Sequence, residues 1–261
     1  MPVPRFHVDA ELDSGREIVL PAAVSRHATR TLRLEEGDPI IVFDGRSDFE
    51  YDATIVASVV SRPDRPGRGG GVKAVLGAAR AVASESPLQI ELVQGLCKGE
   101  RMDFVVQKAT ELGVCAIHPL LCERSVSRPD PGRAKRRIEH WQGVAIHAAQ
   151  QSGRVRIPVI AELQVYEDWM AKGGSSGFFL HPEAKESPSE VDMTGFEGSD
   201  LDPEKSLRVI VGPEGGFSQR EVERAQEAGY RGLRLGPRIL RTETAGLVAI
   251  ALLQARLGDL G

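Results

Sequence analysis

The sequence predicts two domains: a small β-rich domain over residues 1–83 and an α/β domain with a mainly parallel sheet over residues 84–261. Short runs of β-forming residues, separated by turn signals, fill the first part of the chain. From residue 88 onward, apolar runs alternate with helical patterns, which is typical of parallel strands covered by helices. Two loops rich in glycine and proline, 212–216 and 236–244, each follow a predicted strand. Such loops are where an open α/β sheet binds its ligand.

The composition is ordinary for a globular protein, with 41% hydrophobic and 27% charged residues. No apolar run reaches the roughly 18–20 residues that a membrane helix needs, and residues 1–10 lack an apolar signal core. We therefore expect a cytoplasmic protein with no membrane partner. Cys97, Cys115 and Cys122 lack C-x-x-C spacing, which favours free thiols over disulfides. His140 and His147 share a helix face without an H-E-x-x-H pattern, so we expect no metal site.

In the first domain, five runs predict strands at residues 5–8, 17–20, 39–43, 51–60 and 72–76. A helical stretch over 21–32 interrupts them. The pattern indicates a small β-barrel with one inserted helix. Residues 62–71, rich in proline, glycine and arginine, predict a flexible loop inside this domain, and the boundary is expected near 83–87.

In the second domain, apolar runs predict strands at residues 88–96, 115–121, 177–180, 209–211 and 233–235. Helical patterns predict helices at residues 100–112, 133–151, 167–171, 218–228 and 244–256. Ser218 and Glu221 match the capping box S-x-x-E, which satisfies free backbone amides at a helix start. Gly229 is placed to end that helix.

Two charged stretches stand out against a net charge of −4. Residues 181–205 carry eight acids against two lysines and are rich in serine, glycine and proline, which predicts a solvated insertion loop. Residues 122–137 carry six cations against two acids. A basic run is most often a solvated face, but this one enters a long helix near the ends of parallel strands. Together with other cations it would form a track for a nucleic-acid backbone. The candidate RNA contacts are Arg5, Arg26, Arg30, Arg33, Lys98, Arg124 and Arg154.

The first loop, residues 212–216 (GPEGG), has three glycines and a proline among five residues. One interpretation is a tight turn between a strand and a helix. The loop matches neither the P-loop nor the G-x-G-x-x-G pattern. Glu214 in its middle opposes the binding of a phosphate, whereas bare amides at a helix start suit neutral hydroxyls and a base edge. The loop therefore predicts a nucleoside-like ligand without phosphates, a character that S-adenosylmethionine has.

The second loop, residues 236–244 (GPRILRTET), places Arg238 and Arg241 on either side of Ile239 and Leu240. One interpretation is a loop with solvated arginines and an N-capping threonine. The other is a pocket floor of apolar and backbone groups, with Arg241 or Arg238 aimed at a substrate. The density of special residues in both loops favours the second. No cysteine has an obvious catalytic partner in the sequence, so a hydrolase has little support.

The two loops carry a resemblance to a known family. GPEGGFS (212–218) with LGPRILRTETA (235–245) resembles the paired signature of the 16S ribosomal RNA uridine-N3 methyltransferase family, in the SPOUT class of knotted methyltransferases. Other similar blocks follow in order along nearly the whole chain: RFHV, RHATRTLRLEEGD, KGERMDFVVQKATELGV, WQGVAIHAAQQSGR and LHPEA. The chain departs from the family pattern at Gln150, where an acid is expected, and in the length of the acidic stretch after Pro182.

The resemblance implies a PUA-like N-terminal barrel that helps to hold RNA and a deep trefoil knot in the second domain, an exception to the rule against threaded chains. It also implies a homodimer and, as substrate, a uridine near the decoding centre of the small ribosomal subunit. S-adenosylmethionine would lie in the knot. The residues implied to bind it are Leu180, His181, Gly212, Glu214, Gly215, Gly216, Leu235, Gly236, Ile239, Leu240 and Arg241.

For the reaction we expect in-line methyl transfer to N3 of uracil, with Arg241 and Glu243 as catalytic residues. N3 is a weakly acidic imide nitrogen, so a carboxylate must accept its proton: Glu243 or, less probable, Glu214. Arg241 would stabilise the negative charge that grows on the uracil oxygens. The target base has to be unstacked to react. Two alternatives stay open: a methyltransferase of this fold acting on a ribose 2′-hydroxyl or another base, and a non-catalytic RNA-binding assembly factor.

Overall fold

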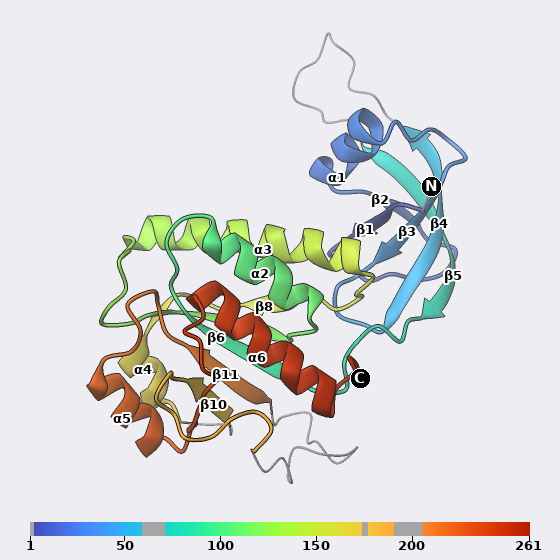
Figure 1. The fold of residues 1–261 in the computed structure, drawn as a ribbon. Coiled ribbons are helices and arrows are strands. Elements are labelled where there is room, and N and C mark those ends of the chain that lie inside the picture. The colour runs from blue at the N-terminus through green and yellow to red at the C-terminus, as the bar shows by residue number, and fades with distance from the viewer. Residues whose placement is uncertain (1–2, 59–70, 174–176, 191–205) are drawn as a thin grey trace. The chain divides into compact units, whose positions relative to one another are not determined.

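The computed structural model describes residues 3–58, 71–173, 177–190 and 206–261 (Figure 1). Two compact units divide the chain: one comprises Met1–Glu85 and Ala149–Ile157, the other Ser86–Ala148 and Pro158–Gly261. The predicted loop at 62–71 lies almost entirely outside the described residues, as does the acidic stretch from 191 to 205. No helix in the described part of the chain combines the length and apolar character that a membrane crossing requires.

The first unit contains a curled, mixed half-barrel sheet of five strands in the order β1-β3-β4-β5-β2. β1 pairs in parallel with β3, and the other neighbours are antiparallel. The strands are β1 (Arg5–His7), β2 (Glu17–Val19), β3 (Pro39–Phe43), β4 (Phe49–Ser58) and β5 (Val72–Ala81). The inserted helical piece is α1 (Ala22–Arg26) continued by the π-helical turn η1 (His27–Thr31). Alternating side chains of these strands, such as Ile40 and Val42, form the core of the unit.

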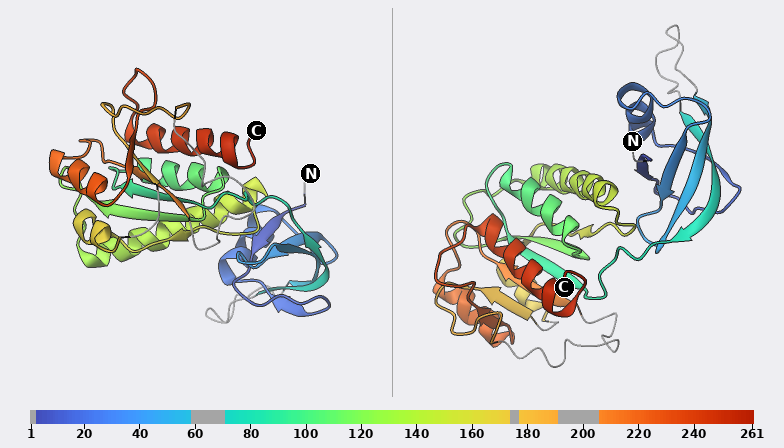
Figure 2. Two further views of the ribbon diagram at one scale, coloured as in Figure 1. Left: turned by 90° about the horizontal axis from the view of Figure 1, so that it is seen from below. Right: turned by 45° about the vertical axis from the view of Figure 1, so that its right-hand side comes forward.

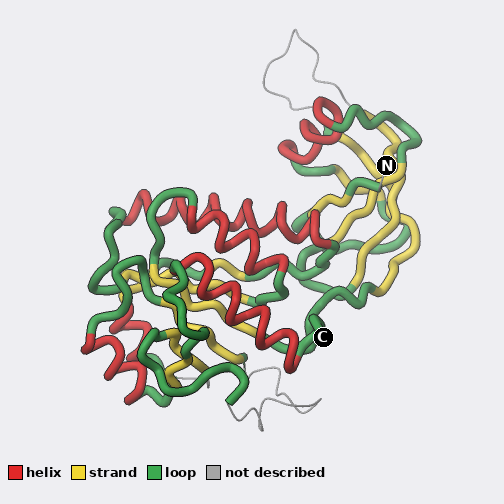
Figure 3. Tube along the Cα trace, in the orientation of Figure 1, coloured by secondary structure: helices red, strands yellow, loops and turns green. Residues whose placement is uncertain are grey.

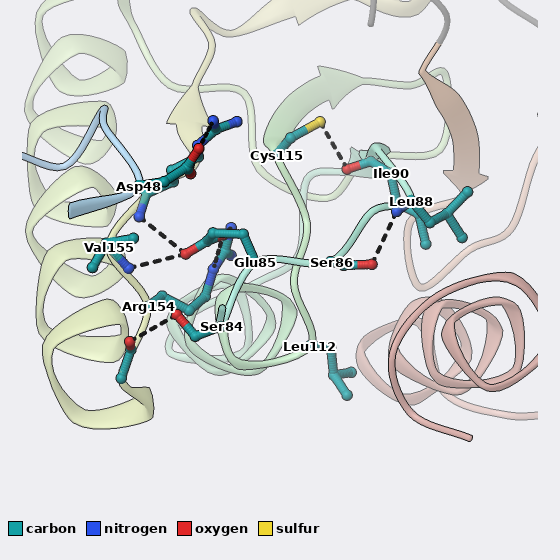
Figure 4. Close-up of polar contacts among 12 residues, drawn as sticks. Asp48, Ser84, Glu85, Ser86, Leu88, Ile90, Leu112, Cys115, Arg154 and Val155 are labelled. Atoms are coloured by element: carbon teal, nitrogen blue, oxygen red, sulfur yellow. Dashed lines mark hydrogen bonds and ion pairs between the residues drawn. The ribbon is translucent and has the colours of Figure 1, made fainter. Parts of the chain in front are cut away.

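A buried ion pair joins the return segment Ala149–Ile157 to the rest of this unit. Glu85 accepts hydrogen bonds from Arg154 Nε at 3.0 Å and from the Val155 amide at 2.9 Å (Figure 4). Gln150 Nε2 donates to the Arg5 carbonyl at 2.8 Å. A carboxylate could not donate this bond, so the departure from the family pattern at Gln150 has a structural consequence: it holds strand β1.

The second unit contains a sheet in the order β12-β10-β11-β6-β7-β8, with every neighbouring pair parallel. Helices α2 and α6 pack against each other, and α6 covers β6 and β11 (Figure 2). Helices α4 and α5 pack together and contact β7 and β12. The strands are β6 (Ile90–Gly95), β7 (Ala116–Leu121), β8 (Val159–Ile160), β9 (Gln164–Val165), β10 (Gly177–Leu180), β11 (Leu207–Val211) and β12 (Arg231–Leu233). The helices are α2 (Arg101–Glu111), α3 (Pro131–Ser152), α4 (Tyr166–Ala171), α5 (Gln219–Glu227) and α6 (Thr242–Leu257).

The predicted fold class is confirmed. The sequence missed the two-residue strands β8 and β9, and β5 continues five residues beyond its predicted end at 76. Strand β12 lies two residues before its predicted position, and α6 begins at Thr242 rather than at 244. Residues 181–190 form a loop with no buried residue, and Glu186 in it bridges to Leu233 and forms an ion pair with Arg231 at 2.6 Å. The rest of the predicted solvated stretch, 191–205, lies outside the described residues. The knot stays a prediction from the resemblance.

A buried charge cluster ties the first halves of the central strands together. Glu91 on β6 lies beside Arg208 on β11, and its Oε2 accepts from Arg208 Nε at 2.8 Å. Arg208 also lies over the Trp169 ring, 5.0 Å from its centroid. Burial alone would raise the pKa of Glu91, but hydrogen bonds from His118, Ser206 and Arg208 lower it to about 2.

We expect Glu91→Gln to lower the free energy of unfolding at pH 7 by about 3 kcal/mol, because the half-buried Arg208 loses its counter-charge. The folded-state pKa of about 2 lies below the ordinary 4.5, so the stabilisation is present above pH 4.5 and is lost as the pH falls towards 2. The difference in the free energy of unfolding between wild type and variant should therefore be about 1.4 kcal/mol smaller at pH 3.5 than at pH 6. Urea unfolding at both pH values measures it. Glu227→Gln, which breaks an exposed pair with Arg224, is the matched control. A gap of the same size at both pH values would contradict the assignment.

Candidate active site

A pocket of about 860 Å³ lies in the second unit, where β10, β11 and β12 end in three loops (Figure 3, loops in green). The carboxyl ends of parallel strands meet at one edge of a sheet, which is why these loops converge. The first loop follows Leu180, the second follows Val211 and the third follows Leu233. Both loops singled out in the sequence therefore face one cavity.

The glycine-rich loop 212–216 lies against the end of the neighbouring strand β6. A Cβ added at Gly95, the last residue of β6, would lie 2.5 Å from the Pro213 nitrogen, so only glycine permits this approach. Gly216 turns the chain with a φ of +68°. The predicted capping box at Ser218 and Glu221 is present and starts α5. The backbone path of the loop is thus fixed at both of its ends.

Glu214 is anchored at the start of helix α2 instead of pointing freely into the cavity. Its Oε1 accepts from the Lys98 amide at 2.9 Å and from Arg101 at 3.1 Å. Burial would raise the pKa of Glu214, but these hydrogen bonds and the charge of Arg101 hold it below its ordinary value. The carboxylate therefore stays charged and occupied, and it adds negative potential to the cavity wall.

A buried hydrogen-bond chain links the second loop to the first. Gln94 Nε2 on β6 donates to Thr242 Oγ1 at 2.9 Å, and Thr242 Oγ1 donates to the Gly212 carbonyl at 2.5 Å. Thr242 is the first residue of α6, and Arg241 precedes it as N-cap without a side-chain cap bond. The N-capping interpretation of the threonine is therefore wrong at this position. Its hydroxyl holds the two loops together.

Glu243 differs from Glu214 in what surrounds its oxygens. Its side chain is 15% exposed and lines the pocket, and Arg101 Nε lies 3.7 Å from Oε1. Oε2 is buried and has no hydrogen-bond partner among the described residues. A carboxylate oxygen without a hydrogen-bond partner has lone pairs to offer to a proton donor. Arg241 lines the same pocket with an exposed side chain.

Every residue predicted to bind the cofactor lines this single pocket, as do both predicted catalytic residues. The sequence did not single out Arg101, Thr242 or Gln94. Gln94 is one of three polar residues in the predicted strand 88–96, beside Gln89 and Glu91, so the sequence did not mark it, and nothing in the chain marked Arg101. No group of three or more potential metal ligands occurs among the residues that the structure describes.

The predicted RNA contacts fall into two groups. Arg26, Arg30, Arg33, Lys98 and Arg124 have exposed side chains. Arg5 and Arg154 do not: Arg5 pairs with Glu50 at 2.8 Å, and Arg154 is 4% exposed and pairs with Glu85 at 2.7 Å. The prediction is corrected for these two arginines, because their guanidinium groups hold the first unit together.

Comparison with known proteins identifies the family. Residues 84–254 match the model of the RNA methyltransferase domain. Ribosomal RNA small subunit methyltransferase E of Bacillus subtilis is 32% identical, over 86% of this chain and 84% of that protein. The chain belongs to this methyltransferase E family. The family's homologue of Mycobacterium tuberculosis is 31% identical over 94% of this chain and 88% of that protein.

Solved structures of related proteins extend the comparison to three dimensions. The methyltransferase E of Neisseria gonorrhoeae, bound to S-adenosyl methionine, is 32% identical, with a TM-score of 0.85 over 99% of this chain and 100% of that one. A Legionella pneumophila protein in complex with the bound cofactor SAM is 31% identical, with a TM-score of 0.87 over the full length of both chains. The likeness covers both units of the methyltransferase described above.

Proposed function

We propose that this protein transfers a methyl group from S-adenosylmethionine to N3 of one uridine in 16S ribosomal RNA, near the decoding centre of the small subunit. The observation that carries the proposal is a carboxylate oxygen of Glu243 that has no hydrogen-bond partner in the described part of the chain, in a pocket built from the two loops that carry the family resemblance. Family membership supports the enzyme class and the ribosomal substrate. A cytoplasmic location would follow from that substrate.

The pocket fits the proposed cofactor in shape and charge. Gly212, Gly215 and Gly216 offer backbone groups without side chains, as a base edge and ribose hydroxyls require. Glu214 and Glu243 on the pocket wall would attract a cationic sulfonium. Five arginines line the same pocket, so the charge of its wall does not by itself exclude a phosphate. The complete set of residues that would hold the cofactor is Leu180, His181, Gly212, Glu214, Gly215, Gly216, Leu235, Gly236, Ile239, Leu240 and Arg241. The bound sulfonium supplies an activated methyl group and a good leaving group.

Glu243 is the better proton acceptor of the two carboxylates. Glu214 uses its Oε1 for two hydrogen bonds and has a lowered pKa, so it is a poor base. Glu243 Oε2 is buried and has no hydrogen-bond partner among the described residues, so we assign the N3 proton of uracil to it. Arg241 would stabilise the negative charge that the deprotonated base places on its oxygens. The protein otherwise positions its two reactants.

The RNA would be held by exposed cations, most directly by Lys98 and Arg124. Both contact the glycine-rich loop: the Lys98 amide donates to Glu214, and Arg124 donates to the Gly215 carbonyl. Arg26, Arg30 and Arg33 in the N-terminal unit would add backbone contacts. The family match begins at residue 84, which supports an RNA-binding PUA-like domain over 1–83 and a methyltransferase domain over 84–261. Residues 149–157 follow residue 84 in the sequence but belong to the first compact unit.

A homodimer is part of the proposal. Helix α6 is apolar around most of its circumference, and its Leu252 is 41% exposed. Ile239 at the pocket mouth is 85% exposed, which is unusual for so large an apolar side chain. A second copy of the chain would cover both. Sedimentation equilibrium should give twice the mass of one chain, and a monomer at micromolar concentration would contradict this part.

The proposal is tested by incubating the protein with radiolabelled S-adenosylmethionine and small ribosomal subunits from a strain that lacks this modification. We expect about one methyl group per small subunit and none on large subunits. Label on another RNA would favour the alternative of a methyltransferase with a different target. The non-catalytic alternative predicts no label, and calorimetry would then detect no cofactor binding.

A further inference from the structure

Arg101 is the only residue on the described pocket wall that contacts both carboxylates of the site. Its NH1 lies 3.1 Å from Glu214 Oε1, and its Nε lies 3.7 Å from Glu243 Oε1. It is the first residue of α2, so its backbone is fixed by a helix that packs on α6, the helix that carries Glu243. Its side chain is 43% exposed, whereas those of Glu214 and Glu243 are 23% and 15% exposed.

We propose that Arg101 is a positioning residue for methyl transfer: it holds Glu243 Oε1, so that Oε2, which is buried and has no hydrogen-bond partner among the described residues, is kept as the proton acceptor. This inference rests on the proposed function. Its geometric basis is that the two Glu243 oxygens are unlike: one has a cation beside it and the other has no hydrogen-bond partner among the described residues. A carboxylate without that cation could rotate and lose this asymmetry.

The surroundings of the pair indicate why a cation is needed there. Two carboxylates face the same guanidinium, and the buried Cys97 thiol lies within their field. Burial raises the pKa of Cys97 to about 12; the charges of Glu214 and Glu243 add to this rise, while Arg101 opposes it. Like charges at such short range destabilise each other. Arg101 is therefore the cation that both carboxylates share.

The test is a double-mutant cycle with Glu243→Gln, measured as kcat with cofactor and small subunits both saturating. We expect Arg101→Gln to lower kcat by about 10–100-fold, as for loss of part of a general-base contribution. The double variant should have a kcat less than about threefold below that of Glu243→Gln alone, because there is no longer a base for Arg101 to position. Arg101→Lys keeps the charge and should recover most of the activity. The melting temperature of each variant shows whether it is folded.

Arg124→Gln is the matched control, because Arg124 NH1 also reaches the glycine-rich loop, at the Gly215 carbonyl, but contacts no carboxylate there. The fold-decreases in kcat caused by Arg124→Gln and by Glu243→Gln should multiply in the double variant. The inference is overturned if Arg101→Gln keeps kcat within threefold of wild type, or if its effect multiplies in full with Glu243→Gln. The proposed function fails separately, when the wild-type protein itself transfers no methyl group to small subunits.

Discussion

Replacing Glu243 with glutamine is expected to lower kcat by about 10²–10⁴-fold, the usual contribution of a general base. Glutamine keeps the size of the side chain but cannot accept a proton from an imide nitrogen. Glu243 Oε2 has no hydrogen-bond partner among the described residues, so the substitution should disturb little else. Cofactor affinity, measured by calorimetry, should change by less than about fivefold. Single-turnover methyl transfer to small subunits measures the chemical step.

The matched control is Glu214→Gln, which replaces the other carboxylate of the pocket. Its hydrogen bonds to the Lys98 amide and Arg101 hold the glycine-rich loop, so this change should weaken cofactor binding more than it slows the saturated reaction. If Glu214→Gln abolishes turnover while Glu243→Gln keeps it near wild type, the roles of the two glutamates are exchanged. If both variants turn over normally, neither is the base.

Gly95→Ala is expected to raise the cofactor dissociation constant by at least about 100-fold and to lower the free energy of unfolding by about 3 kcal/mol. The new methyl group would lie 2.5 Å from the Pro213 nitrogen and 2.8 Å from the Gly212 carbon, both backbone atoms. The glycine-rich loop would have to move away from β6. That movement would also stretch the hydrogen bond from Thr242 to Gly212. Calorimetric titration and urea unfolding measure the two effects.

Gly143→Ala serves as control for the added methyl group. A Cβ at Gly143, in helix α3, would meet no atom within 4 Å. Alanine in a helix interior is favoured over glycine by about 1 kcal/mol, so this variant should be slightly more stable and should bind cofactor normally. Wild-type cofactor affinity in Gly95→Ala would show that the close approach of loop and strand does not shape the pocket.

The local patterns of the sequence predicted most of the fold. The capping box at Ser218 and Glu221 is present because it depends only on residues three positions apart. Strands β3 and β10 have their predicted bounds. The two-residue strands β8 and β9 left no periodic pattern, because each forms only a few ladder bonds with β7.

The sequence predicted the two loops of the candidate site but not the contacts between residues that are far apart in the chain. Glycines, prolines and charged residues marked both loops within short windows of sequence. Arg101 lies more than a hundred residues from Glu214 and Glu243. The packing of α2 against α6 brings Arg101 to Glu243, and the approach of the glycine-rich loop to β6 places Glu214 beside them. The same limit explains why the sequence did not reveal the ion pairs of Arg5 and Arg154. A cation in a sequence predicts a phosphate contact only if no carboxylate reaches it first, and Glu50 and Glu85 do.

The most direct test of the account is the identity of the methylated nucleoside. Small subunits from the unmodified strain are incubated with the protein and labelled S-adenosylmethionine, and their 16S RNA is then digested to nucleosides. Chromatography with mass detection should place all of the label in 3-methyluridine, and Glu243→Gln should form little of it. Label in a ribose-methylated nucleoside or in another base would contradict the assignment of N3 as the acceptor and of Glu243 as its base.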